Sequence, residues 1–244
     1  MEGSTAETNT STAIKQDKVV AKAEWIMKWE QKNICFHQQH VHRLLENYVD
    51  LLLNNRTNLR IFFPLCGKAV DMKWLADMGH SITGVDVSEI GLKDFFTEQN
   101  ISYVEEQVSD IPGAKVFKSL SGNISLYCCS IYDMCRVADK FDCIWDRGAL
   151  VAINPCDRER YANVLSSLMG REFRYLLVTV SYDHTKHSGP PFYVPDVEVD
   201  KLFGTFCCIK HLEKVDAFKE RHQKWGLDYF YENIYLLTPK PSLN

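Results

Sequence analysis

Residues 59–88 read LRIFFPLCGKAVDMKWLADMGHSITGVDVS, and this stretch indicates the fold. Leu59–Leu65 and Ser81–Val87 are short apolar runs of the kind that form buried strands. Lys68–Met78, between them, is expected to form a helix, which Gly79 ends as a C-cap glycine does. A strand, a helix and a second strand in direct succession predict a parallel unit of a layered α/β sheet.

The alternation of strands and helices continues toward the carboxyl end of the chain. Ser88 is a suitable N-cap for a helix over Glu89–Gln99 that ends at Asn100. Such alternation predicts a mostly parallel sheet with helices on both faces, in which the last two strands could pair as an antiparallel edge. Further strands are expected at 115–119, 124–129, 141–145, 174–180, 205–212 and 227–237, and further helices at 155–169, 196–203 and 216–225.

The N-terminal part of the chain divides into a polar tail and a helical cover. Residues 1–20 are rich in polar side chains and are expected to form a disordered tail, which leaves 21–244 as a single folded domain. Trp25 and Trp29 lie four residues apart and would share one face of a helix. A second helix is expected over Phe36–Leu53, because its apolar residues recur at helical spacing.

The composition excludes several classes of function. The chain has 244 residues and a formal net charge of −4, with no basic stripe, which indicates one α/β domain that does not bind nucleic acid. It lacks the roughly 20 consecutive apolar residues of a membrane span, and it lacks a secretory signal. Its nine cysteines follow no framework spacing, which favours a reducing compartment and hence the cytoplasm. Since neither a heptad repeat nor an association-prone strand edge is evident, we expect a monomer.

Two residues at the carboxyl ends of the first two strands indicate an adenosine-containing ligand. Ligands of such sheets bind at that edge. Gly67 lets the backbone approach a ligand closely, and Asp86 is placed like the acids that accept hydrogen bonds from ribose. The pattern G-x-G-x-x-G is absent, which favours S-adenosylmethionine over a dinucleotide. Taken alone, each residue also fits an ordinary turn or a helix cap.

The residues at the carboxyl ends of two later strands are further candidate ligand contacts. Ser130 and Ile131 follow a strand and could meet the edge and the face of an adenine, although a plain strand end has the same pattern. Arg147 leaves another strand, where a cation suits a carboxylate or a developing negative charge. Asp146 could neutralise this cation, and a solvated surface arginine is an equal alternative.

A metal centre and a serine hydrolase are both disfavoured. His37, His40 and His42 form a cluster, but only the first two could share a helical face, and no Glu or Cys completes a ligand set. The G-x-S-x-G elbow of α/β-hydrolases is also absent. We therefore expect no bound metal.

Five motifs in this order resemble the thiopurine S-methyltransferase family. They are FFPLCGK (62–68), GVD (84–86), CCSI (128–131), IWDRGALVAINP (144–155) and GPPFYVP (189–195). The likeness runs from about Trp25 to Thr238. It implies a class I S-adenosylmethionine-dependent methyltransferase fold, with a Rossmann-like, mostly parallel seven-stranded sheet and an N-terminal helical cover.

The resemblance also implies a reaction and the roles of individual residues. The expected reaction is in-line transfer of a methyl group from S-adenosylmethionine to an aromatic or heterocyclic thiol. S-adenosylhomocysteine would be the product and xenobiotic metabolism the setting. Arg147 and Arg221 are candidates to position the acceptor by their charge, and no residue is a certain catalyst. By position, the expected cofactor contacts are Trp25, Trp29, Phe36, Leu65, Asp86, Ser130, Ile131 and Arg147, and Gly67 of the loop after the first strand is added to them. The expected acceptor contacts are Phe36, Arg147 and Arg221.

The chain departs from mammalian members of the family around the expected site. Asp86 stands where they usually have Glu, Met134-Cys135 and Cys156 replace Leu-Pro and Gly, and His184 replaces a loop proline. These differences bear on the range of acceptors. Two alternative functions remain: a methyltransferase for another small nucleophile, such as a halide, an inorganic thiol or a selenium compound, and a cofactor-binding relative that has lost catalysis.

Overall fold

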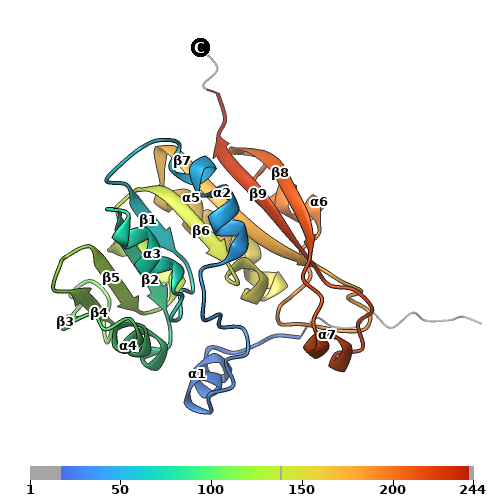
Figure 1. The fold of residues 1–244 in the computed structure, drawn as a ribbon, viewed down its shortest axis with the longest axis horizontal. Coiled ribbons are helices and arrows are strands. Elements are labelled where there is room, and N and C mark those ends of the chain that lie inside the picture. Colours follow the sequence, from blue (N-terminus) through green and yellow to red (C-terminus); the bar gives the residue numbers. More distant parts are fainter. Residues whose placement is uncertain (1–17, 138, 242–244) are drawn as a thin grey trace, which may run out of the picture.

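The computed structural model describes residues 18–137 and 139–241. Within these residues nine strands form one sheet, and helices cover both of its faces (Figure 1). The strands are β1 (Arg60–Phe63), β2 (Ser81–Asp86), β3 (Tyr103–Gln107), β4 (Lys115–Ser119), β5 (Ile124–Cys128), β6 (Phe141–Arg147), β7 (Met169–Ser181), β8 (Cys207–Asp216) and β9 (Tyr231–Pro239). The helices are α1 (Lys22–Glu30), α2 (Arg43–Leu53), α3 (Asp71–Asp77), α4 (Glu89–Glu98), α5 (Arg158–Leu168), α6 (Asp196–Phe203) and α7 (Glu220–Lys224), with short 3-10 turns η1 (Ile131–Arg136), η2 (Leu150–Ala152) and η3 (Pro155–Asp157).

The strands lie in the order β3-β4-β5-β2-β1-β6-β7-β9-β8. The five strands from β5 to β7 run parallel to one another, whereas β9 runs antiparallel to both β7 and β8. The expected antiparallel edge is therefore confirmed. The chain moves outward from β1 in one direction through β2 and then in the other through β6. This reversal opens a crevice at the carboxyl ends of the strands, where such sheets bind ligands.

The sheet has two more strands than the seven that the resemblance implied. The strands from β5 to β8 in the sheet order account for the seven, and the antiparallel hairpin of β3 and β4 extends the sheet beyond β5. The sequence did not reveal β3 because four of its five residues are exposed, and only Tyr103 packs against the core. In addition to the antiparallel ladder with β4, ion pairs link the two strands: Glu105 with Lys115 at 2.8 Å and Glu106 with Lys118 at 2.5 Å.

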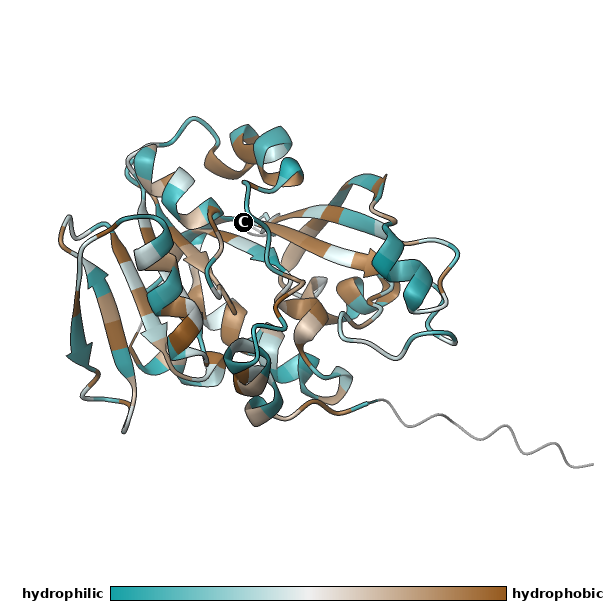
Figure 2. Cartoon of the chain, turned by 60° about the horizontal axis from the view of Figure 1, so that its bottom comes forward, coloured by the Kyte–Doolittle hydropathy of each residue, from teal (hydrophilic) through white to brown (hydrophobic). Residues whose placement is uncertain are grey.

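Two apolar layers hold the helices against the sheet. On one face α2, α3 and α4 pack through side chains such as Leu45, Leu75 and Phe95, which are fully buried. On the other face α5 and α6 pack through Tyr161 and Phe203. Figure 2 shows hydrophobic residues concentrated in the strands between the helices. Each large apolar side chain that is fully buried contributes roughly 1.5–3 kcal/mol, so these layers supply most of the stabilisation.

The helix expected over Phe36–Leu53 begins seven residues later, at Arg43. The His42 side chain caps it and accepts a hydrogen bond from the Leu44 N–H at 3.3 Å. The segment before His42 crosses from α1 to the sheet without helical structure. By contrast, Ser88 caps α4 as predicted, accepting a main-chain N–H of the first turn at 3.2 Å.

Two of the last three strands, β7 and β8, are longer than the sequence indicated, whereas β9 is shorter and begins at Tyr231 instead of residue 227. The helix expected at 216–225 is only α7, because β8 continues to Asp216 along β9. The strand expected at 174–180 begins at Met169, where β7 pairs with the start of β6. No helix in the described part of the chain is both long enough and apolar enough to cross a bilayer.

The N-terminal cover begins within the predicted tail. Residues 1–17 lie outside the described residues, but Val20 is buried. Its N–H donates to Oδ1 of Asn154 at 2.8 Å, and its carbonyl oxygen accepts from Nδ2 of the same side chain at 3.2 Å. The folded part of the chain therefore includes Val20, just before the boundary expected at residue 21.

Candidate active site

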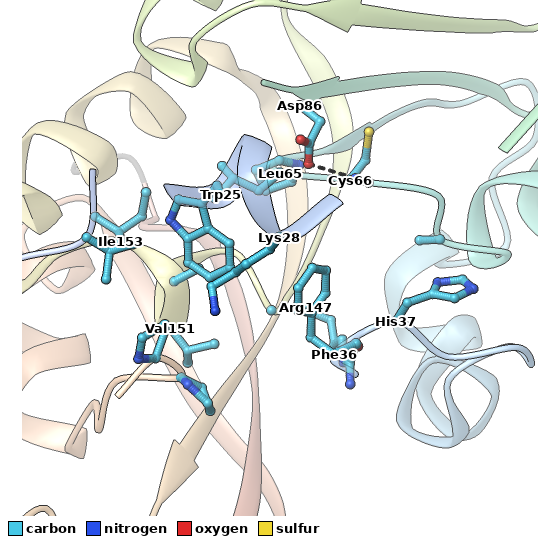
Figure 3. A pocket seen from close by; sticks show the side chains of 18 of the residues that line it. Trp25, Lys28, Phe36, His37, Leu65, Cys66, Asp86, Arg147, Val151 and Ile153 are labelled. Atoms are coloured by element: carbon cyan, nitrogen blue, oxygen red, sulfur yellow. Dashed lines mark hydrogen bonds between the residues drawn. The ribbon is translucent and has the colours of Figure 1, made fainter. Parts of the chain in front are cut away.

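The carboxyl ends of β1, β2 and β6 border a cavity of about 610 Å³. All ten candidate site residues line it, although they come from distant parts of the chain. The topology explains this, because the carboxyl ends of neighbouring parallel strands meet at one edge of a sheet. The ten residues are Trp25, Trp29, Phe36, Leu65, Gly67, Asp86, Ser130, Ile131, Arg147 and Arg221. Figure 3 labels Trp25, Phe36, Leu65, Asp86 and Arg147 among them.

The loop after β1 is bonded directly to the end of β2. The Gly67 N–H donates to Oδ2 of Asp86 at 2.9 Å, and the Ser88 N–H donates to Oδ1 at 2.9 Å. Leu65 and Gly67 both have a positive φ, 45° and 48°, and such strained backbone is concentrated at ligand sites. A Cβ on Gly67 would lie 2.8 Å from the Trp29 ring, so only glycine fits this position.

Asp86 retains acceptor capacity for a ligand. Burial raises its pKa, and hydrogen bonds from main-chain N–H groups partly offset that effect. An ionised carboxylate has about four acceptor positions, and the N–H groups of Gly67, Ser88 and Val87 are bonded to this one. The acceptor capacity that is left is available to a hydroxyl donor from a molecule in the cavity.

Three aromatic side chains from α1 and the segment after it cover the cavity. The ring centroids of Trp25 and Trp29 lie 5.9 and 5.7 Å from that of Phe36, both edge-to-face, a geometry that aromatic pairs prefer. Figure 3 shows Trp25 and Phe36 close together in the cavity. Trp29 is buried against Gly67 and Gly91, where added Cβ atoms would lie 2.8 and 3.0 Å from its ring. The cover is therefore packed against α4 as well as the loop.

The turn after β5 contributes Ser130 and Ile131. Because β5 pairs with β2 from Ile82 to Asp86, this turn lies beside the Asp86 loop. Ile131 is buried, and the Ser130 hydroxyl accepts a hydrogen bond from the Tyr132 N–H at 3.3 Å. Ser130 thus caps η1 in addition to bordering the cavity.

Two arginines bind the cover segment from the opposite side. Nη1 of Arg147 donates to the carbonyl oxygen of Phe36 at 2.9 Å. Nη1 of Arg221 donates to the carbonyl oxygen of Cys35 at 2.7 Å. The two guanidinium groups are therefore held at consecutive carbonyls, which concentrates positive charge at this end of the cavity.

Two carboxylates that the sequence did not single out compensate the charge of Arg147. Burial lowers the pKa of this guanidinium, and the negative charges of Glu232 and Asp71 act against that. Asp71 accepts a hydrogen bond from the His42 N–H at 2.8 Å, and Glu232 lies 3.5 Å from Nε2 of the same histidine. Asp71 is the first residue of α3 and lies close in sequence to the β1 loop, so a local pattern could have identified it. Glu232 lies on β9, and no local pattern marks it.

Asp146 does not neutralise Arg147, so that interpretation was wrong. Successive residues of a strand point to opposite faces of the sheet, and Asp146 lies on the face covered by α5. It accepts hydrogen bonds from the hydroxyls of Tyr161 and Tyr175 at 2.6 and 2.7 Å and from the Leu150 N–H at 3.0 Å. Its carboxyl group joins β6 to α5 and β7.

The cavity wall next to α7 is aromatic, which the sequence did not predict. Trp225, His187 and Phe230 line it. The His187 imidazole is stacked on the Trp225 indole, with centroids 4.4 Å apart and 3° between the ring planes. His187 belongs to the β7–α6 loop, Trp225 directly follows α7 and Phe230 directly precedes β9, so only the fold brings them together. A flat aromatic molecule suits such a wall.

The positions expected to differ from mammalian members of the family that the motifs resemble lie mostly outside the cavity. Asp86 lines it, whereas Cys135 and Cys156 are exposed and border a separate hollow. His184 is exposed and stacks on Tyr193 with ring centroids 5.3 Å apart.

The three histidines that are close in sequence do not form one site in the structure. His37 and His42 border the cavity, while His40 is exposed. Within residues 18–137 and 139–241, no three His, Cys, Asp or Glu side chains are arranged to hold a metal ion.

The fold is shared with S-adenosylmethionine-dependent methyltransferases. The 1,6-didemethyltoxoflavin-N1-methyltransferase of Burkholderia thailandensis, solved with S-adenosylhomocysteine, matches with a TM-score of 0.62 at 12% identity over 90% of this chain and 87% of that one. Magnesium protoporphyrin IX methyltransferase from Synechocystis PCC 6803, solved with S-adenosylmethionine, matches with a TM-score of 0.59 at 12% identity over 92% and 100%. The chain thus has the class I methyltransferase fold.

Sequence comparison gives the family within this class. The family model for thiopurine S-methyltransferase matches residues 20–240. The thiopurine S-methyltransferase of Oryctolagus cuniculus is 59% identical over 230 residues, 94% of either chain. That of Rattus norvegicus is 58% identical over 228 residues, 93% of this chain and 95% of the relative. The chain belongs to the thiopurine S-methyltransferase family, which confirms the resemblance in its motifs.

Proposed function

We propose that this chain transfers a methyl group from S-adenosylmethionine to the sulfur of thiopurines and related aromatic or heterocyclic thiols. The arrangement of the cavity is the observation that supports this most strongly. One end has the Asp86 loop, and the other has the arginine pair and the aromatic wall at Trp225. These ends suit a nucleoside donor and a flat acceptor with negative charge. The relatives named above carry this activity in their names.

The half of the cavity around Asp86 fits the cofactor. The carboxylate has acceptor positions for the ribose hydroxyls, and Ile131 offers an apolar surface for the adenine beside Ser130. Leu65 and Gly67 place the backbone close to this ligand. The absence of a Cβ at Gly67 leaves room for the Trp29 ring, which a Cβ would approach to 2.8 Å.

The residues at the other end act on the acceptor. When bound, the donor supplies an electrophilic methyl group on its sulfonium. The protein must bring the acceptor sulfur into line with that group, and such alignment accounts for much of an enzyme's rate enhancement. Arg147 and Arg221 stabilise the acceptor as a thiolate, so no strong base is required. Trp25 and Phe36 exclude water from the reacting atoms.

We place the protein in the cytoplasm as a monomer with one methyltransferase domain over 21–244 and a role in xenobiotic metabolism. Nine cysteines without a disulfide support the compartment. The net charge of −4 argues against nucleic acid as a partner. A small thiol is the partner proposed, and neither a membrane nor a metal has a role in this scheme, since the sulfonium needs no Lewis acid.

Replacing Arg147 tests this function. Arg147→Ala should lower kcat/KM for 6-mercaptopurine roughly 10- to 100-fold, the value of a lost charge-assisted hydrogen bond. The assay follows labelled methyl groups from S-adenosylmethionine, and thermal unfolding verifies the fold. Arg171→Ala, at an exposed arginine, is the matched control. Unchanged turnover in Arg147→Ala contradicts the role of the guanidinium.

The same assay separates the alternative functions. Calorimetric binding of S-adenosylhomocysteine without methylation of any thiol would indicate a non-catalytic relative. Methylation of a halide, an inorganic thiol or a selenium compound in preference to aromatic thiols would indicate a different nucleophile.

A further inference from the structure

The Glu232 carboxylate borders the cavity, and the reaction described above does not use it. Glu232 lies on β9, where it pairs with Val180 of β7 and Val215 of β8, so the sheet fixes its main chain. Its side chain is 16% exposed, and it lines the cavity together with Arg147 and Arg221. A negative group therefore lies in the end of the cavity that holds the arginine pair.

One oxygen of this carboxylate is bonded to the protein, and the other is free. Nδ1 of His42 accepts a hydrogen bond from the Leu44 N–H at 3.3 Å, so the imidazole proton is on Nε2. Nε2 lies 3.5 Å from Oε2 of Glu232 and donates to the carboxylate. Within residues 18–137 and 139–241 no group donates to Oε1, and this atom is not among the polar atoms that are buried without a partner. Oε1 is therefore open to a molecule in the cavity.

The surroundings of Glu232 keep it ionised. Burial raises the pKa of this carboxyl, but interactions with His42, Arg147 and Lys219 outweigh burial, and the pKa lies below its ordinary value. An ionised carboxylate only accepts hydrogen bonds, and the bonds that it accepts are stronger than those between neutral groups. A molecule that brings an N–H to Oε1 is therefore favoured.

The opposite charges at this end of the cavity suit different atoms of one acceptor. In the described part of the chain no direct ion pair joins Arg147 to Glu232, although each charge shifts the pKa of the other group. Arg147 has five N–H donors, and its hydrogen bond in the structure goes to the carbonyl oxygen of Phe36. A molecule with both a thiolate and an N–H can therefore bond to the guanidinium and the carboxylate together.

We propose that Oε1 of Glu232 accepts a hydrogen bond from a ring N–H of the acceptor, so that the site selects heterocyclic thiols with an N–H over thiols without one. This inference rests on the proposed function and narrows its substrate class. The thiolate of 6-mercaptopurine keeps an N–H on its imidazole ring, whereas benzenethiol has none. The arginine pair then binds the sulfur, Glu232 binds the ring, and the two contacts together align the sulfur with the methyl group.

Glu232→Gln, assayed with two acceptors, tests the proposal. The His42 Nε2–H requires the amide oxygen, so the amide NH2 turns to the cavity and meets the ring N–H donor to donor. Because a hydrogen bond to a charged group is lost, kcat/KM for 6-mercaptopurine should fall roughly 10- to 100-fold. With benzenethiol kcat/KM should stay equal or rise, because the substitution removes a negative charge near the thiolate.

A second variant and two measurements serve as controls. Glu213→Gln removes a carboxylate of the neighbouring strand β8 that accepts a hydrogen bond from the Tyr48 hydroxyl at 3.0 Å. This variant should keep the wild-type ratio of the two kcat/KM values. Thermal unfolding and calorimetric affinity for S-adenosylhomocysteine should be unchanged in Glu232→Gln, which verifies that its fold and its cofactor site are intact.

Several outcomes would overturn the proposal. A parallel fall with both thiols in Glu232→Gln would show that the carboxylate only holds Arg147 in place. A value for 6-mercaptopurine that is unchanged or raised would show that no N–H bonds to Oε1. Weaker binding of S-adenosylhomocysteine would assign Glu232 to the donor.

Failure of the proposed function is distinguishable from failure of this inference. If the wild-type protein methylates neither thiol, the proposed function fails. Calorimetric titration of 6-mercaptopurine into the complex with S-adenosylhomocysteine then tests Glu232 without turnover. Binding at least tenfold weaker in Glu232→Gln supports the contact with the ring, and equal binding contradicts it.

Discussion

At the scale of single residues, three constraints meet at Gly67. Its φ is 48°, its N–H is bonded to the Asp86 carboxylate, and the Trp29 ring fills the space that a Cβ would need. The first constraint favours glycine on conformational grounds, and the third excludes other residues sterically. This single position therefore links the β1 loop, the β2 carboxylate and the aromatic cover.

Gly67→Ala should be more destabilising than an ordinary substitution at a positive φ. Such a conformation costs a non-glycine residue about 1–3 kcal/mol, and here Trp29 must also move. Gly122→Ala is the matched control, because Gly122 has a φ of 78° but open space around it. Urea unfolding should show the larger loss for Gly67→Ala, and calorimetry should show weaker S-adenosylhomocysteine binding in that variant alone. Equal losses in both variants would argue against the contact with Trp29.

At the scale of elements, the Asp146 carboxyl joins β6 to α5 and β7. It accepts hydrogen bonds from the Tyr161 and Tyr175 hydroxyls on the face of the sheet opposite Arg147. All three side chains are buried. Asp146 thereby fixes the carboxyl end of β6, the strand that positions Arg147 in the cavity.

Tyr161→Phe tests this link without leaving a large void. The buried carboxyl would lose one of its donors, which should cost about 1–3 kcal/mol in the free energy of unfolding. Urea denaturation followed by circular dichroism measures it. Tyr229→Phe, at a tyrosine that is 41% exposed, should change the free energy of unfolding by less than about 0.5 kcal/mol. A loss no larger than in this control would mean that the hydroxyl contributes nothing to stability.

At the scale of the whole molecule, the N-terminal cover is attached at points that are distant in the sequence. The Val20 main chain is bonded to Asn154, Trp29 packs on Gly67 and Gly91, and the carbonyls of the segment after α1 are bonded to two arginines. These contacts tie α1 to both halves of the sheet. The closure of the cavity is thus a property of the complete fold.

Asn154→Ala should loosen this attachment while leaving the sheet intact. Two hydrogen bonds to Val20 would be lost, and each is worth about 0.5–1.5 kcal/mol. Hydrogen exchange of residues 18–30 should accelerate several-fold, and binding of S-adenosylhomocysteine should weaken. Asn163→Ala, at an exposed asparagine of α5, is the control. If exchange in α1 matched that control, the Asn154 side chain would not hold the cover.

The sequence by itself determined the class of fold and most of the cavity lining. Strands and helices have local periodicities, so β1, α3, β2 and α4 could be recognised from residues 59–99. The rule that ligands bind at the carboxyl ends of parallel strands then located Gly67, Asp86 and Arg147. The candidates from the cover and from α7 lie outside the five motifs, and they came from their position in the wider family resemblance.

Only the tertiary structure decided which distant side chains meet. Packing of α5 and β7 against β6 gave Asp146 its two tyrosine partners, and the pairing of β9 with β7 brought Glu232 into the surroundings of Arg147. The same fold stacked His187 on Trp225. The formation of the exposed strand β3 and the start of α2 at Arg43 also depend on contacts with neighbouring elements. Local patterns encode which face of an element is apolar, whereas these contacts depend on register and crossing geometry, which arise only when the elements pack.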